Sequence, residues 1–176
     1  MGLRLKLALI NPAEKKSYGF SAHRFLLSPP LSLAYLAALT PDDWDVEIVD
    51  ENFDAFKIIE DADLVGITSF TSTVRRAYEI AQLYDKRGIP TVMGGIHVAM
   101  LPDEALQHCR SVVMGEAEEV WRHVLDDFRA NNLKEKYRGP WASLENMVKP
   151  RRDVLSKRYV RGTIQTSPVA LRDVTR

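Results

Sequence analysis

Hydroxyl and glycine residues gather after two apolar runs of the chain, and residues of these types can hold a ligand. One run is followed by Ser69-Phe70-Thr71-Ser72-Thr73, and the other by Gly94-Gly95-Ile96-His97. Hydroxyl groups both donate and accept hydrogen bonds, and glycine lets a large ligand come close to the backbone. The two clusters favour a bulky cofactor that carries many amide and phosphate groups. An alternative stays open, in which the hydroxyls only cap a following helix and the glycines only form a turn.

The elements that must position both clusters read as strand, helix and strand. The two apolar runs are residues 64–68 and 89–93, and apolar residues between them recur at helical spacing over 74–86. An apolar strand on each side of a helix is typical of a parallel sheet that is covered on both faces. Because the crossover in such a unit is almost always right-handed, both clusters should lie side by side at the carboxyl edge of the sheet, where open α/β sheets bind ligands.

The rest of the pattern predicts an α/β domain, a flavodoxin-like or Rossmann-like parallel sheet of five strands with helices on both faces. Strands are predicted over 6–10, 47–50, 64–68, 91–94 and 111–114, and helices over 31–39, 74–86, from Pro102 and over 116–130. Residues 51–62 are predicted as a weak helix or a loop. Residues 1–130 would form this domain. Residues 131–176 are rich in charge and lack an apolar face, so we expect a linker or extended arm that packs little against it. If the arm is ordered, we expect it to contact another chain or to lay a short helix across the domain.

The composition is that of an ordinary globular protein and argues against several kinds of partner. The sequence has 24 Lys and Arg residues and 24 Asp and Glu residues, so a formal net charge of zero gives no electrostatic reason to expect nucleic acid or an anionic membrane. No apolar run approaches the roughly 20 residues of a membrane span, and the first residues lack a signal-peptide pattern. A cytoplasmic location is therefore expected. The single cysteine, Cys109, rules out an internal disulfide.

Common phosphate and nucleotide motifs are missing from the ends of the predicted strands. The first strand ends in Asn11-Pro12-Ala13 instead of Gly-x-Gly-x-x-Gly, and the chain has no Walker-type Gly-x-x-x-x-Gly-Lys-Ser/Thr sequence. A receiver domain would need an aspartate where Thr68 stands and a lysine where Met114 stands. The acids that follow Gly115, beginning with Glu116, lie in the first turn of a predicted helix, where the helix dipole already favours them.

Several short motifs, in their order and spacing, resemble the cobalamin-binding domain of B12-dependent radical SAM enzymes. The resemblance covers roughly residues 5–128 and rests on Pro29-Pro30-Leu31-Ser32-Leu33-Ala34-Tyr35-Leu36-Ala37, Val49-Asp50, Gly66-Ile67-Thr68-Ser69, Gly94-Gly95-Ile96-His97, and Pro102 with Gly115-Glu116-Ala117-Glu118. It implies that the corrin ring of cobalamin lies at the carboxyl edge and that the nucleotide tail reaches toward Ser69 and Gly94-Gly95. In that family the chemistry, commonly methyl transfer to unreactive carbon, is done by a second domain. That domain is a partial barrel, which binds S-adenosylmethionine and holds an iron–sulfur cluster on Cys-x-x-x-Cys-x-x-Cys.

Two departures shape what the resemblance implies. The Asp-x-His-x-x-Gly motif, whose histidine binds cobalt in B12 domains of the mutase and methionine-synthase type, does not occur in this chain. Bound cobalamin is therefore expected base-off without a protein histidine on cobalt, because His23 lies outside any such motif and His97 is expected to be simply hydrogen-bonded. The family linker is matched by Pro150-Arg151-Arg152-Asp153, but Thr166-Ser167 is not followed by the cluster cysteines. A truncation or frame change after Ser167 would account for this, and no radical chemistry is expected of the chain alone.

The residues expected to contact the cofactor lie at the strand ends and in the long loop 13–30. Tyr18 and Phe20 of that loop are expected to cover a face of the corrin. A bulky residue in place of Gly94 or Gly95 is expected to abolish binding and leave the fold intact. No catalytic residue and no metal ligand is assigned. Two alternatives remain, a small flavodoxin-like enzyme or flavin-binding protein and an interaction domain without a cofactor. The expected cofactor contacts are Asn11, Pro12, Tyr18, Phe20, Thr68, Ser69, Thr71, Ser72, Gly94, Gly95, His97, Gly115 and Glu116.

Overall fold

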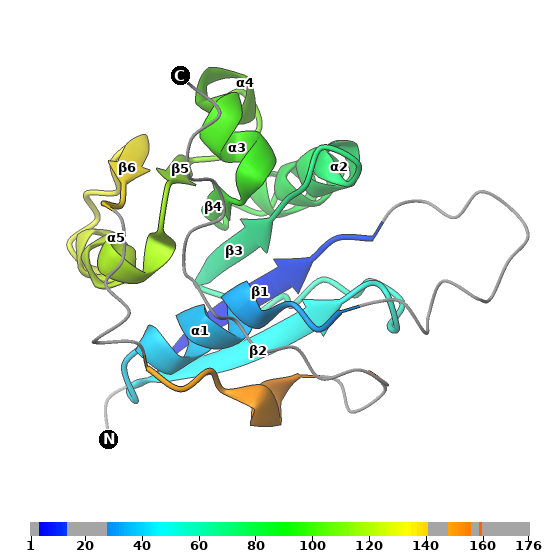
Figure 1. Cartoon of the computed structure of the whole chain (residues 1–176). Coiled ribbons are helices and arrows are strands. Elements are labelled where there is room, and N and C mark those ends of the chain that lie inside the picture. Colours follow the sequence, from blue (N-terminus) through cyan, green and yellow to red (C-terminus); the bar gives the residue numbers. More distant parts are fainter. Residues whose placement is uncertain (1–3, 14–27, 141–147, 156–158, 160–176) are drawn as a thin grey trace, which may run out of the picture.

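Six parallel strands form the central sheet of the computed structural model, which describes residues 4–13, 28–140, 148–155 and 159 (Figure 1). The strands lie in the order β2-β1-β3-β4-β5-β6, and all neighbours run parallel. This confirms the predicted flavodoxin-like sheet, including each strand that the sequence pattern predicts. The strands are β1 (Leu5–Asn11), β2 (Trp44–Asp50), β3 (Leu64–Thr68), β4 (Thr91–Gly94), β5 (Ser111–Met114) and β6 (Lys136–Arg138).

Helices cover both faces of the sheet, because the inner strands are apolar on both sides. Along β1, Ala8 and Ile10 pack in one apolar cluster with α2, whereas Leu7 and Leu9 pack in a second cluster with α1 and α5. Successive side chains of a strand point to opposite faces, so β1 joins the two layers. Within the described residues, no helix is long and apolar enough to cross a membrane. The helices are α1 (Leu31–Leu39), α2 (Val74–Asp85), α3 (Ile96–Met100), α4 (Pro102–Ala105) and α5 (Trp121–Arg129), with the 3-10 turns η2 (Ala117–Glu119) and η4 (Arg152–Val154).

Helix α1 is apolar almost all the way round, and it is covered on two sides. A helix of this kind needs burial around most of its circumference. Its Leu33 and Ala37 pack in the cluster that faces the sheet. The segment that contains η4 lies beside α1 (Figure 1), where the Arg151 N–H donates to Ala34 O at 3.0 Å and Val154 packs against the same cluster. Residues 148–155 therefore take part in the fold of this domain.

Strand β6 corrects the prediction of five strands and the prediction that residues beyond 130 pack little against the domain. It pairs with β5, and Tyr137 at its centre is 6% exposed. The Tyr137 hydroxyl donates to Asp127 Oδ2 at 2.9 Å, and Leu133 packs against the same apolar cluster. The strand has three residues, with one buried residue between two exposed charged ones. It is too short for an alternating pattern to stand out from the sequence.

Two further segments differ from their predictions. Residues 116–130 do not form one helix, because the 3-10 turn η2 precedes α5. Residues 51–62 form turns without a helix, which agrees with the loop alternative of their prediction. The short helix α3 directly follows Gly95, where the sequence pattern showed only the end of a strand. The glycine pair at the carboxyl edge therefore leads straight into a helical turn.

Candidate functional site

The ends of β3 and β4 bring the hydroxyl cluster and the glycine pair together. Thr68 and Gly94 are partners in the register of the two strands. The Ser69 N–H donates to Gly94 O at 2.9 Å, and the Ser69 hydroxyl donates to the same oxygen at 3.3 Å. Ser69 is 1% exposed, so its side chain is a buried tie between the two loops. The hydroxyl cluster and the glycine pair therefore lie side by side, as the sequence predicts. The Ser69 hydroxyl itself donates its hydrogen bond to the Gly94 carbonyl oxygen.

The loop 69–73 is closed by its own hydrogen bonds and leaves three residues exposed. The Phe70 N–H donates to Thr73 Oγ1 at 3.1 Å, and the Thr73 N–H donates to Phe70 O at 3.0 Å. The Thr73 side chain makes no capping hydrogen bond to α2, which argues against the hydroxyl cluster as a helix cap. Phe70 is 60% exposed, with Thr71 and Ser72 exposed beside it. Phe70 is not one of the expected cofactor contacts. A large apolar residue inside a run of hydroxyl residues is nevertheless a sequence pattern that indicates a ligand contact.

Gly94 and Gly95 differ in the space around them. A Cβ on Gly94 would meet Val113 O at 3.7 Å, an ordinary contact, and would have no other atom of the described residues within 4 Å apart from its chain neighbours. A Cβ on Gly95 would lie 2.4 Å from Ser69 O, and the φ of Gly95 is 101°, a conformation that favours glycine. The expectation that a bulky residue at Gly95 leaves the fold intact is therefore wrong, because the Ser69 backbone occupies that space. Gly94 leaves open the space that a side chain would fill.

The loops after β5 and β6 approach each other backbone to backbone. A Cβ on Gly115, whose φ is 75°, would lie 2.6 Å from Gly139 O. A Cβ on Gly139 would lie 1.8 Å from Glu116 O. The packing of the two loops therefore explains the glycine at 115 without a ligand. The sequence does not single out Gly139, because Gly-Pro-Trp at 139–141 reads as a plain turn.

A buried carboxylate accepts several hydrogen bonds at the ends of β1 and β2. Asp50 is 3% exposed, and its Oδ1 accepts from Asn11 Nδ2 and Asn52 Nδ2, each at 3.0 Å. The Tyr159 hydroxyl donates to Asp50 Oδ2, and the Tyr159 ring meets the Phe53 ring edge to face at 4.6 Å. Burial, together with the Asp50 carboxylate, raises the pKa of the Tyr159 hydroxyl. Asn11, an expected cofactor contact, is thus held in a protein network whose other members the site prediction did not include.

His97 lies near the start of α3, and both of its ring nitrogens face protein groups. Nδ1 lies 3.3 Å from Thr71 Oγ1, and Nε2 lies 3.4 Å from Glu104 Oε1. The residue is 7% exposed. The expected hydrogen-bonded histidine is therefore present, with a partner on α4 that the sequence does not indicate. Tyr18, Phe20 and His23 lie outside the described residues, whereas Pro12 is buried and Thr68 and Glu116 are half-buried at the carboxyl edge.

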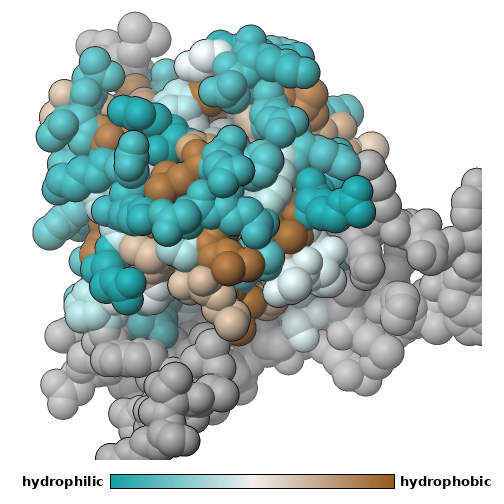
Figure 2. Space-filling model, turned by 90° about the horizontal axis from the view of Figure 1, so that it is seen from above, coloured by the Kyte–Doolittle hydropathy of each residue, from teal (hydrophilic) through white to brown (hydrophobic). Residues whose placement is uncertain are grey.

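The exposed surface is mainly hydrophilic on the face shown in Figure 2, and apolar side chains form small patches between polar ones. Among the described residues, the large apolar residues with high exposure are Phe70, Met100, Leu101 and Val148. Phe70 belongs to the loop 69–73, and Met100 and Leu101 end the helix that begins at the glycine pair. Three of these four residues therefore belong to the segments that follow β3 and β4.

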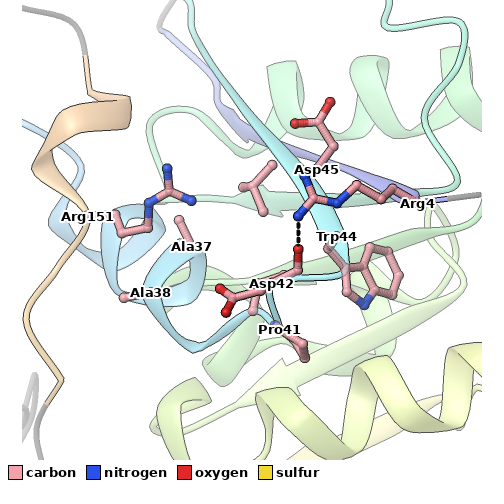
Figure 3. Close-up of a pocket in the computed structure, with 10 residues that line it drawn as sticks. Arg4, Ala37, Ala38, Pro41, Asp42, Trp44, Asp45 and Arg151 are labelled. Carbon is pink, nitrogen blue, oxygen red and sulfur yellow. Dashed lines mark hydrogen bonds between the residues drawn. The ribbon is translucent and has the colours of Figure 1, made fainter. Parts of the chain in front are cut away.

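A cavity of about 250 Å³ is lined by residues next to the starts of β1 and β2, including Arg4 and Trp44 (Figure 3). It therefore lies at the amino edge of the sheet, away from the candidate site. Charged residues of both signs line it, namely Arg4, Asp42, Asp45 and Arg151. The Arg4 guanidinium donates to Asp42 O at its margin, as the dashed line in Figure 3 marks. The described residues that line the cavity include none of the expected cofactor contacts. The cavity is therefore separate from the candidate site.

Cys109 is expected to react slowly with thiol reagents in the native protein. Its sulfur lies 3.2 Å from both Ala105 O and Ser111 O, so the single S–H can donate to either carbonyl, and burial raises the pKa of the thiol to about 12. Because the thiolate is the reactive form, the native thiol should react with dithiodipyridine at pH 8 on the order of a hundredfold more slowly than the urea-unfolded thiol. The measurement is the rate of thiopyridone release under the two conditions. Equal rates would contradict the burial of this side chain.

Comparison with known proteins finds a family model that covers more than half of the chain. The model is described as "B12 binding domain", and it matches residues 21–125. This range contains the loop 69–73, the glycine pair, His97 and Glu104. The carboxyl-edge residues between β3 and η2 are therefore within the matched region.

Curated methyltransferases are similar to the chain over part of their length. The bacteriochlorophyllide d C-8(2)-methyltransferase of Chlorobaculum tepidum is 45% identical over 108 residues, which are 61% of this chain and 24% of that protein. The bacteriochlorophyllide d C-12(1)-methyltransferase of the same organism is 34% identical over 138 residues, which are 77% of this chain and 30% of that protein. The hopanoid C-2 methylase of Rhodopseudomonas palustris is 28% identical over 107 residues, 56% of this chain and 20% of that protein. The chain thus spans less than a third of each of these relatives.

Proposed function

The chain belongs to the B12-binding domain family, and we propose that it holds cobalamin at the carboxyl edge of its sheet, against the loop 69–73 and Gly94. The observation that carries this placement is the open space at Gly94, whose carbonyl oxygen is bonded to Ser69 of the loop that exposes Thr71 and Ser72. Cobalamin is a large ring surrounded by amide groups and extended by a nucleotide tail. An edge that offers hydroxyl partners, bare backbone and the exposed Phe70 ring fits such a ligand. The amino-edge cavity, with its mixed charges, does not.

The cofactor is proposed to bind base-off and without a protein histidine on cobalt. A histidine ligand needs one ring nitrogen free for the metal, and its other nitrogen is usually held by a carboxylate or carbonyl. In His97, Nε2 meets Glu104 and Nδ1 meets Thr71, so both nitrogens are taken by protein groups. Tyr18 and Phe20 remain the proposed cover of one corrin face.

The purified chain is expected to bind hydroxocobalamin and to give, after reduction to cob(II)alamin, a paramagnetic resonance spectrum without nitrogen splitting. A coordinated nitrogen would split the cobalt lines. Binding is measured by absorbance titration, followed by gel filtration to separate free cofactor, and flavin mononucleotide serves as the comparison ligand. Binding of the flavin instead of cobalamin would favour the flavodoxin-like alternative. Nitrogen splitting that disappears in His97→Ala or His23→Ala would make that histidine the ligand and refute the proposed absence of a histidine on cobalt. Nitrogen splitting that persists in both variants would show the cofactor's own base on cobalt and refute the base-off proposal.

We further propose that the chain is the cofactor module of a radical SAM methyltransferase that methylates carbon. The motifs resemble that class, and the relatives are named as methyltransferases for numbered carbon positions. When bound, cobalamin supplies the methyl group for such a transfer, while this chain binds and orients it. A four-iron cluster takes about three or four thiolates, and this chain has one cysteine. The partner is therefore proposed to be a separate domain that binds S-adenosylmethionine and the cluster. The connection to it is proposed to run through the residues of the 131–176 segment that follow η4.

A further inference from the structure

A line of hydrogen-bond partners runs from α4 through the buried His97 to the exposed loop 69–73. Glu104 Oε1 lies 3.4 Å from His97 Nε2, and His97 Nδ1 lies 3.3 Å from Thr71 Oγ1. The three residues come from α4, α3 and the loop after β3. His97 is 7% exposed, whereas Thr71 is exposed. The line therefore ends at the surface that is proposed to receive the cofactor.

The chemistry of the partners gives each hydrogen bond a direction. The Tyr78 hydroxyl donates to Glu104 Oε1 at 3.0 Å, and burial together with that carboxylate raises the pKa of the hydroxyl and keeps it protonated. A carboxylate only accepts, so His97 Nε2 also donates to Glu104. In the tautomer that carries its proton on Nε2, His97 has an acceptor at Nδ1, and the Thr71 hydroxyl is placed to donate to it. The lone pairs of Thr71 Oγ1 then remain for a ligand.

We propose that Glu104 and His97 are positioning residues that fix Thr71 Oγ1 as an acceptor for an amide N–H at the corrin periphery. This rests on the proposed function, in which cobalamin lies at this edge. The amide groups around the corrin carry N–H donors, whereas the phosphate of the nucleotide tail only accepts. A Thr71 hydroxyl that donates its one hydrogen bond to His97 can still accept a hydrogen bond from an amide N–H. It has no hydrogen left to donate to a phosphate oxygen. Without His97, the Thr71 hydroxyl would rotate freely and lose this preference.

The positioning role predicts coupling between Thr71 and His97 in the affinity for hydroxocobalamin. Thr71→Val keeps the shape of the side chain and removes the hydroxyl, so the Kd is expected to rise about tenfold, and His97→Phe is expected to raise it about fivefold. The double variant is expected to match Thr71→Val alone, because the orientation of a hydroxyl cannot matter once the hydroxyl is gone. Thr71→Ser is expected to retain most of the affinity. The readout is the absorbance titration, with urea unfolding of each variant as the check on folding.

Glu104 provides a second test that does not depend on the folding of His97→Phe. Glu104→Gln keeps an acceptor oxygen and is expected to bind within about twofold of the wild-type affinity, whereas Glu104→Leu is expected to lose about fivefold. His123→Asn, at an exposed position of α5, is the control and is expected to bind like the wild type. Effects of Thr71→Val and His97→Phe that multiply in the double variant, or wild-type affinity in Thr71→Val, would overturn the proposal. Absence of binding by the wild-type chain would instead overturn the proposed function.

Discussion

Phenylalanine in place of Gly94 is expected to abolish cobalamin binding while the chain still folds. A Cβ at this position meets Val113 O at an ordinary 3.7 Å, so the added ring extends into the space that the cofactor is proposed to use. We expect the Kd for hydroxocobalamin to rise more than about a hundredfold, which corresponds to about 2.7 kcal/mol. The free energy of unfolding should change by less than about 1 kcal/mol. Absorbance titration and urea unfolding of the same preparation measure the two quantities.

The neighbouring glycine supplies the matched comparison. Gly95→Ala adds a single methyl group, but at a φ of 101° and 2.4 Å from Ser69 O. Backbone strain and displacement of the Ser69 loop should together lower the free energy of unfolding by about 2–4 kcal/mol. Gly94→Ala should cost less than about 1 kcal/mol. Equal losses for the two alanine variants would contradict this backbone geometry, and wild-type affinity in Gly94→Phe would place the cofactor elsewhere.

Tyr137→Ala is expected to lower the free energy of unfolding by about 3 kcal/mol, because the variant removes a large side chain from the core. The ring is 6% exposed, and its hydroxyl donates to Asp127 and accepts from the Lys134 N–H at 3.0 Å. Tyr137→Phe keeps the ring and should lose about 1 kcal/mol. Lys136→Ala, on the exposed side of the same strand, is the control and should stay within about 0.5 kcal/mol of the wild type. A Tyr137→Ala chain as stable as the wild type in urea would show that β6 adds nothing to the domain.

The Tyr137 hydroxyl is expected to make the free energy of unfolding decrease at alkaline pH. Burial raises the pKa of Tyr137 to about 12, above the ordinary tyrosine value of about 10. A group whose pKa is raised in the folded state contributes stability that is fully present below about pH 10 and is lost as the pH rises toward 12. Tyr137→Phe should remove this part of the pH dependence. Urea unfolding of both proteins between pH 9 and pH 12 provides the comparison.

The inner strands could be predicted because their apolar runs are continuous, and the meeting of Ser69 with Gly94 followed from their order. The different roles of Gly94 and Gly95 could not be predicted, since they depend on one dihedral angle and on the place of the Ser69 carbonyl. The hydrogen-bond partners of His97 could not be predicted from the sequence either. Glu104 becomes its neighbour only through the turn that joins α3 to α4, and no spacing rule marks that turn.

Contacts between distant parts of the chain were also beyond the sequence pattern. Tyr159 and Asp50 are separated by 109 positions, and nothing in either segment points to the other. The uniform apolar character of α1 indicates that something covers the side away from the sheet. It does not indicate that residues 148–155 do so. Segments with few apolar residues can still be fixed in place when their partner surface is folded first.

Strand β6 also bears on how the protein avoids aggregation. An edge strand offers a row of unpaired N–H and C=O groups to neighbouring molecules, and β5, whose four residues are all buried, would be such an edge without β6. β6 closes that edge with three residues, of which Lys136 and Arg138 are exposed and charged. The opposite edge, β2, exposes Asp45 and Glu47. Charged edges discourage strand pairing between molecules, so a fragment that stopped before residue 136 would present a bare apolar strand from which intermolecular β-structure can grow.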